Sequence, residues 1–233
     1  MLNLIGEALA KWKSDRQSGP VIAVSQPPDA RYLRTPPPGA LILNVFTRIP
    51  HTDSDGTGWT PNHATGRDHM WLSEADWRSL LPPEWKNGVT YPLNGTIAAR
   101  LARFHLVDNV RGEPDAWRSE QVRIAEFRLT VEDPLIGRIR LNGTARMEAN
   151  GRGYNARLQG ELICDRKRSC LTQIELLAWG EAWGEGNYTR GAPKGQFPLL
   201  VSLSLAGNTP ADRVPPQSIR SQQDYWGASR ASW

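Results

Sequence analysis

Apolar and polar residues alternate along the second half of the chain, from about residue 119 to 206. Strict alternation places successive side chains on opposite faces of a half-buried strand. Four segments follow this pattern and two further apolar runs have strand character, so the predicted strands cover residues 125–131, 138–147, 154–162, 172–178, 197–206 and 40–49. The connections between the four alternating segments are short, which predicts antiparallel hairpins.

The alternation also predicts how the second and third of these hairpin strands pair. If Met147 lies opposite Tyr154, then Arg140 lies opposite Glu161 on the polar face, as an opposite-charge cross-strand pair.

Two glycines, Gly143 and Gly160, fall on the apolar face of the same two strands. Glycine inside a strand marks close packing or a bend. We therefore expect a strongly curved sheet that wraps around the helices.

Two helices are expected before this sheet. Ser73 and Asp76 have the spacing of a capping box, and Pro82 would stop that helix. A second helix runs from about Gly95 to His105, with apolar residues on one face. The predicted fold class is α+β. It combines a strongly curved antiparallel sheet of five to six strands, a partial barrel or half-sandwich, with two short helices packed against it.

The 233 residues fit one domain with attachments. Residues 1–39 have the pattern of an amphipathic helix followed by an extended Pro-rich arm, and residues 40–206 that of a single α+β domain. Residues 207–233 are expected to form an extended C-terminal tail. Because the tail contains Tyr225 and Trp226, packing onto a surface is the alternative for it.

Charge and composition narrow the classes of partner. The net charge is +4, and Arg166–Arg168 is the only tight basic run, so no nucleic-acid binding is expected. No stretch approaches the roughly 20 apolar residues of a membrane span, so no transmembrane segment is expected. The ten Trp residues fit either a surface that stacks on a sugar or other ligand, or a core and its rim.

The two cysteines, Cys164 and Cys170, flank a predicted hairpin loop. Continued alternation would place both on the apolar face of neighbouring strands, where their Cβ atoms suit a disulfide. A disulfide would indicate an oxidising compartment, whereas free thiols would indicate the cytosol.

The four histidines lie between residues 51 and 105, near several aspartates. Imidazoles and carboxylates bind divalent transition metals, so His51, His63, His69 and His105 are the candidate metal ligands, although their spacing fits no compact motif. In the alternative interpretation, His51 and His63 are exposed loop residues and His69 forms a local hydrogen bond. His105 then lies at a helix C-terminus, where its protonated form suits the helix dipole.

Familiar catalytic motifs are missing: there is no nucleophile elbow, phosphate-binding loop or dinucleotide fingerprint. Glu181 and Glu185 lie beside Trp side chains, a setting that can raise carboxyl pKa values for acid–base catalysis. The alternative is a strand end that runs into a Gly-rich loop, with Trp179 and Trp183 covering an open edge of the core. Whether the protein is an enzyme stays open.

Four segments, 68–72, 103–114, 153–189 and 212–216, resemble an uncharacterised family of exported bacterial proteins of unknown function. The resemblance covers roughly residues 40–220 and transfers no functional residue. It implies an exported protein and favours the disulfide. The first 19 residues lack the apolar stretch of a signal peptide.

Together these patterns favour a non-enzymatic binding or assembly module, exported or periplasmic and envelope-associated, that contacts a protein partner or a second copy through its Trp- and Pro-rich termini. A cytoplasmic location is the alternative. The competing function is a metal-dependent enzyme with a His/Asp site in residues 51–105.

Overall fold

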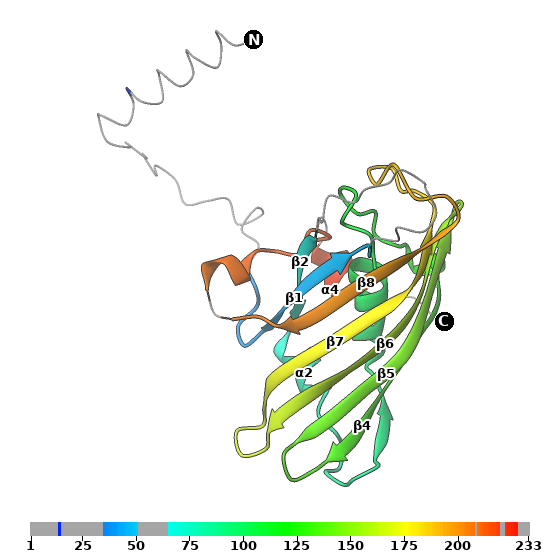
Figure 1. The fold of residues 1–233 in the computed structure, drawn as a ribbon. Coiled ribbons are helices and arrows are strands. Elements are labelled where there is room, and N and C mark those ends of the chain that lie inside the picture. Colours follow the sequence, from blue (N-terminus) through cyan, green and yellow to red (C-terminus); the bar gives the residue numbers. More distant parts are fainter. Residues whose placement is uncertain (1–13, 15–34, 51–64, 208, 220–221, 228–233) are drawn as a thin grey trace. The chain divides into compact units, whose positions relative to one another are not determined.

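The computed structural model describes residues 35–50, 65–207, 209–219 and 222–227, together with Ser14. The chain divides into two units, Met1–Arg34 and Thr35–Trp233, and the description below concerns the second. Its eight strands form one antiparallel sheet in the order β2-β1-β8-β7-β6-β5-β4-β3 (Figure 1). The predicted α+β class is confirmed in its coarse form, an antiparallel sheet with few helices.

The regular elements have the following bounds. The strands are β1 (Leu41–Arg48), β2 (Gly66–Leu72), β3 (Thr90–Pro92), β4 (Val122–Asp133), β5 (Arg138–Ala149), β6 (Arg152–Asp165), β7 (Cys170–Trp183) and β8 (Gln196–Leu205). The helices are α2 (Glu74–Arg78), α3 (Gly95–Arg100), its π-helical continuation (Leu101–His105), α4 (Gln222–Trp226), and 3-10 turns at Ser119–Gln121 and Pro210–Arg213.

The expectation of five to six strands in a partial barrel is wrong, because the sheet has eight strands and is open. Strand β2 escaped prediction since all residues from Asp68 to Leu72 are buried, which removes the alternation. Strand β3 has three residues and ends on Pro92, too little for a periodic signal.

The predicted pairing of β5 with β6 is confirmed, with Arg140 opposite Glu161. The side chains of Arg140 and Glu161 nevertheless form ion pairs with other residues. Arg140 forms its ion pair with Glu132 of β4, while Glu161 lies 3.7 Å from Arg138. Register therefore follows from the alternation, whereas the choice among neighbouring opposite charges depends on side-chain geometry.

The two strand glycines permit a close approach of neighbouring backbones. A Cβ atom at Gly143 would lie 2.2 Å from the Glu126 carbonyl oxygen, and one at Gly160 would lie 2.1 Å from that of Glu175. Any side chain at either position would force the paired strands apart.

The core lies between the inner face of the sheet and the helix formed by α3 with its π-helical turn (Figure 1). This helix is buried on two sides. Ile97 and Leu101 pack in the main core, while Phe104 packs in a second cluster with Trp71 and Tyr225. Because α3 lies between the sheet and the C-terminal residues, both must be in place to cover it.

The capping box predicted for the first helix is confirmed. The Ser73 side chain accepts from the Asp76 backbone N–H, and Asp76 Oδ2 accepts from the Ser73 N–H at 2.9 Å. The helix is shorter than expected, since α2 ends at Arg78 and not at Pro82.

The described C-terminal residues from 216 onward, called the C-terminal clasp below, cover the free edge of β2. Gln217 Nε2 donates to the Arg67 carbonyl at 3.1 Å, and the Trp71 N–H donates to Tyr225 Oη at 3.0 Å. An exposed strand edge invites pairing with other chains. The clasp removes that hazard by occupying the edge with side chains.

The expected Cys164–Cys170 disulfide is absent, and both cysteines are free. A register shift after Ile163 places Cys164 opposite Leu171, and Cys170 opposite Asp165. The irregularity puts Cys164 in the core, while Cys170 is only half-buried. Simple alternation could not reveal the shift.

Replacing Tyr225 by Phe should destabilise the fold by about 1–3 kcal/mol, because the buried Trp71 N–H loses its acceptor. Urea unfolding of Tyr225→Phe measures the loss. Tyr188→Phe is the matched control, since Tyr188 is 59% exposed. Equal stability of the two variants would contradict the clasp.

Alkylation under unfolding conditions without reductant should add two labels, since both thiols are free. In the native state Cys170 should react well before Cys164, because burial raises the pKa of the Cys164 thiol. Mass spectrometry with peptide mapping measures both outcomes. An unlabelled pair that reacts only after reduction would show a disulfide instead.

Candidate functional site

The four candidate metal ligands do not form a described cluster. His51 and His63 lie outside the described residues. His69 lies on β2 and His105 ends the π-helical turn, and both are buried. Within the described ranges, no three His, Cys, Asp or Glu side chains come together in a way that could hold a metal ion.

His105 belongs to a buried row of polar groups. Its Nδ1 lies 3.5 Å from Asp68 Oδ2, and its Nε2 lies 3.0 Å from Tyr225 Oη. Asp68 Oδ1 also accepts from the Gln217 N–H at 2.8 Å. The order carboxylate, imidazole, hydroxyl is that of a nucleophilic site. Here no substrate can reach it, since Tyr225 is 0% and His105 1% exposed. The row holds the C-terminal clasp in place.

His69 lies on the outer face of β2, opposite Asn44 of β1. Burial and then the Arg67 charge lower the pKa of His69 from its ordinary value of 6.5, and the nearby Asp68 and Asp212 carboxylates oppose the shift only in part. Its Nε2 is buried without a hydrogen-bond partner in the described part of the chain. A neutral, buried imidazole fits this environment.

The two glutamates considered for acid–base chemistry also differ from expectation. The pKa of Glu185 is lowered, chiefly because Glu185 Oε1 accepts the backbone N–H groups of Ala192 and Gly191. Glu185 therefore shapes its loop. Glu181 is exposed on the outward side of β7.

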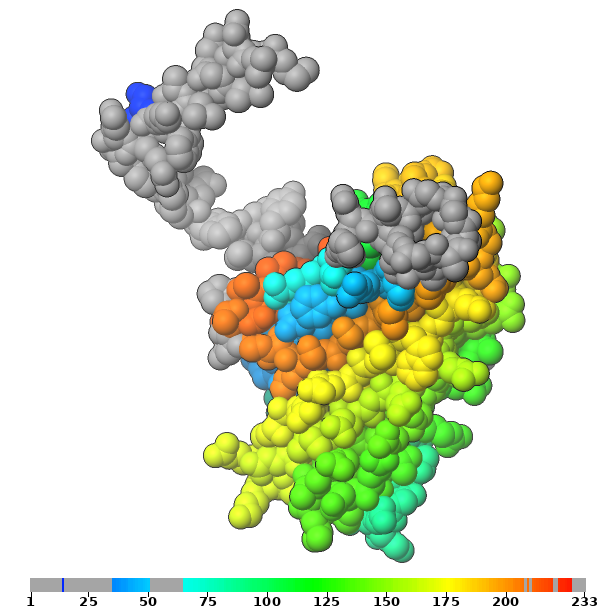
Figure 2. All heavy atoms as spheres, viewed as in Figure 1, coloured from blue at the N-terminus to red at the C-terminus, as the bar shows by residue number. Residues whose placement is uncertain are grey.

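The outer face of β4 to β8, the face turned away from the helices, is turned toward the viewer in Figure 2. Along these strands buried and exposed positions alternate. Two adjoining hollows with volumes of about 760 and 820 Å³ lie on this face and share Trp179. We call this surface the outer sheet face.

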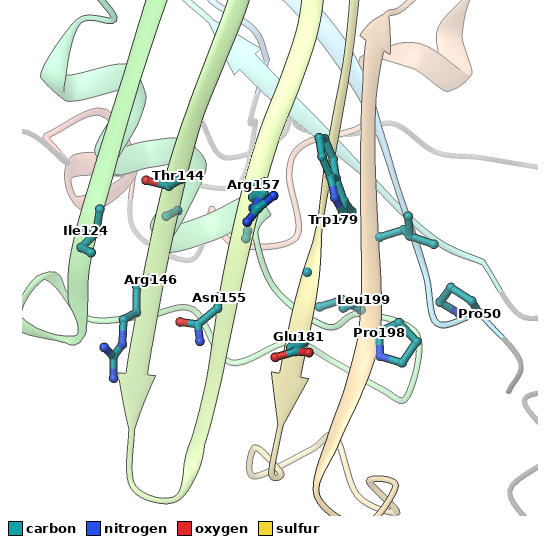
Figure 3. Close-up of a pocket in the computed structure, with 14 residues that line it drawn as sticks. Pro50, Ile124, Thr144, Arg146, Asn155, Arg157, Trp179, Glu181, Pro198 and Leu199 are labelled. Atoms are coloured by element: carbon teal, nitrogen blue, oxygen red, sulfur yellow. The ribbon is translucent and has the colours of Figure 1, made fainter. Parts of the chain in front are cut away.

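Register orders the side chains of the outer sheet face in rows. Arg157 of β6 lies opposite Trp179, and Leu200 of β8 lies on its other side. Leu177 lies in the next row, between Gln159 and Ser202. Figure 3 shows Trp179 and Arg157 side by side over the hollow.

Two large apolar side chains on this face are unusually accessible. Leu177 is 41% and Ile124 is 39% exposed. The sequence placed Trp179 at a strand end over the core, whereas it lies within β7 on the outward side. The sequence does contain a signal for this site: Leu177 and Trp179 are apolar although they occupy the alternate positions of β7 that are otherwise polar.

Comparisons of the chain with protein-family models, with curated proteins and with solved structures find no match. Among the helices that the structure describes, none is both long enough and apolar enough to cross a membrane.

Acidification should destabilise the fold through His69. Its pKa is lower in the folded than in the unfolded chain, so the unfolded chain binds the proton first. The stability that the neutral His69 contributes to the folded chain is complete above about pH 6.5, and it is lost as the pH falls below that value. Urea unfolding from about pH 7.5 to about pH 5.5 should show a shallower decline for His69→Gln. Identical slopes for both chains would contradict this assignment.

Proposed function

We propose that the protein is a non-enzymatic binding or assembly module, exported or envelope-associated, that contacts a protein partner through its outer sheet face. The observation that carries the proposal is the exposed Leu177 next to the half-buried Trp179, two apolar side chains on the same side of β7, on a sheet face that no described helix covers. The assignment to the envelope rests on the resemblance to exported bacterial proteins.

The composition of the face supports a protein interface. Single exposed apolar residues are ordinary, but contiguous ones with a polar rim mark interaction surfaces. Trp and Arg are also enriched among residues that dominate binding energy. Here Trp179 lies opposite Arg157 and beside Leu200, so the chemistry of such an anchor is present.

The width of the face also supports a macromolecule. The first hollow is lined by residues from β4, β5, β6, β7 and β8. At about 4.8 Å between strands, five strands span roughly 20 Å. That width suits a protein surface better than an enclosed small-molecule pocket.

The described C-terminal residues are already engaged within the fold. Tyr225 is fully buried, and Arg103 Nη2 donates to both carboxylate oxygens of Asp224 at 3.1 Å. We therefore assign the contact to the outer sheet face and not to this part of the tail.

Site-specific photo-crosslinking tests the proposal. A photoreactive amino acid at Gln159, in the centre of the face, should give discrete protein adducts in cells that express the chain. The substitution Leu177→Arg in the same chain should reduce their yield by about tenfold or more. An adduct of twice the chain mass would identify the partner as a second copy.

The matched control carries the photoreactive group at Val214, which is 50% exposed and outside the face. Equal adducts at both positions, or adducts that survive Leu177→Arg, would overturn the proposal. A stoichiometric transition metal in untagged protein would support the metal-dependent enzyme instead.

A further inference from the structure

Three loops meet at one end of the sheet. They are the β4–β5 turn (134–137), the β6–β7 turn (166–169) and the loop between α2 and β3 (83–88), at the lower end in Figure 1. Arg166 connects all three, because its Nη1 donates to the Pro134 carbonyl at 2.8 Å and its guanidinium lies 5.3 Å from the centre of the Trp85 ring. We call these loops the hairpin tip.

The hairpin tip presents two apolar side chains to solvent. Leu135 is 86% exposed, the highest value among the large apolar residues that the structure describes, and its neighbour Ile136 is 50% exposed. Neither belongs to the core clusters of the described chain. An adjacent exposed pair at the extremity of a hairpin calls for an apolar environment that the fold itself does not supply.

The turn that carries this pair is held rigidly. Asp133 Oδ1 accepts the Leu135 N–H at 2.9 Å, which fixes the start of the turn. Gly137, with φ +71°, ends it, and the Gly137 carbonyl accepts the Cys164 N–H at 2.9 Å. The apolar pair is therefore presented on a preformed support.

The loops of the hairpin tip also carry four cations. Arg166, Lys167, Arg168 and Lys86 are all exposed. Three carboxylates share this end, Asp133, Asp165 and Glu84, with Glu84 exposed.

Two of these carboxylates are turned toward the backbone. Asp133 caps its own turn, and Asp165 Oδ1 accepts the Lys167 and Arg168 N–H groups at 2.9 and 3.1 Å. Asp165 also lies 3.7 Å from the Arg168 guanidinium, which is 82% exposed. Behind the tip, Arg138 and Arg140 are paired with Glu161 and Glu132. The four cations and three carboxylates give the tip a net charge of +1, and all four cations but only one carboxylate, Glu84, are exposed.

We propose that the hairpin tip binds the surface of an anionic lipid bilayer. Leu135 and Ile136 enter the interface, and the exposed cations contact lipid phosphates. Attachment to a membrane surface strengthens with the apolar area that enters the interface and with electrostatic attraction to anionic lipids. The half-buried Trp85 has the amphipathic ring that favours this depth.

A lipid surface explains the combination of an exposed apolar pair and exposed cations better than other partners do. A nucleic acid would use the cations but has no need of two aliphatic side chains at the outermost point. The projecting form of the tip in Figure 2 also differs from the broad surface that a protein partner needs. The inference is independent of the outer sheet face, since none of its residues is used.

Vesicle flotation with the full chain tests the proposal. The probes are vesicles of phosphatidylcholine alone and of phosphatidylcholine with phosphatidylglycerol. The chain should float with the anionic vesicles, weakly with the neutral ones, and less at high salt. Lys167→Glu with Arg168→Glu should reduce anionic binding by at least roughly fivefold per residue. Leu135→Ser with Ile136→Ser should reduce it by about tenfold or more.

Matched controls keep every other part of the chain, including its N-terminal residues, unchanged. Leu177→Ser with Arg157→Glu alters an apolar and a basic residue on the outer sheet face and should leave flotation unchanged. Flotation that is equal for both lipid mixtures, or insensitive to the tip substitutions, or absent, would overturn the proposal. If the crosslinking experiment on the outer sheet face fails while flotation behaves as expected, only the proposed function is contradicted.

Discussion

The Arg100 guanidinium is almost completely removed from water, and its partners fix how the surrounding elements are placed. It donates to Asp76 Oδ2 at 2.7 Å, to the Trp71 carbonyl at 3.3 Å and to the Tyr225 carbonyl at 3.1 Å. Four elements, α2, β2, α3 and α4, thus converge on one charge. Removing one partner of such a buried pair costs about 3–5 kcal/mol, so these contacts must form together.

Convergence on Arg100 explains which surfaces are covered. The C-terminal clasp reaches the free edge of β2 and the far side of α3 because Tyr225 must bring its carbonyl to Arg100 and its hydroxyl to Trp71. Asp212 covers the outer side of β2 near His69. The described residues from 209 onward therefore cover β2 at one side of the sheet, and the hollows around Trp179 on the outer sheet face are lined by described residues from elsewhere in the chain.

The long hairpins carry both surfaces to which we assign the proposed contacts. Strands β4 to β7 carry the outer sheet face along their length and the hairpin tip at one end, so both surfaces rest on the same hydrogen-bonded scaffold. A rigid support reduces the ordering cost of binding.

Local sequence determined the features that depend on near neighbours: the alternation of β4 to β8, the register that sets Arg140 opposite Glu161, and the capping box at Ser73. Side-chain parity and hairpin length suffice for these. Tertiary structure alone decided the rest. The shift at Cys164, the burial of His69 and His105 and the meeting of Arg166 with Pro134 join residues through register irregularity or long-range packing, which no local pattern encodes.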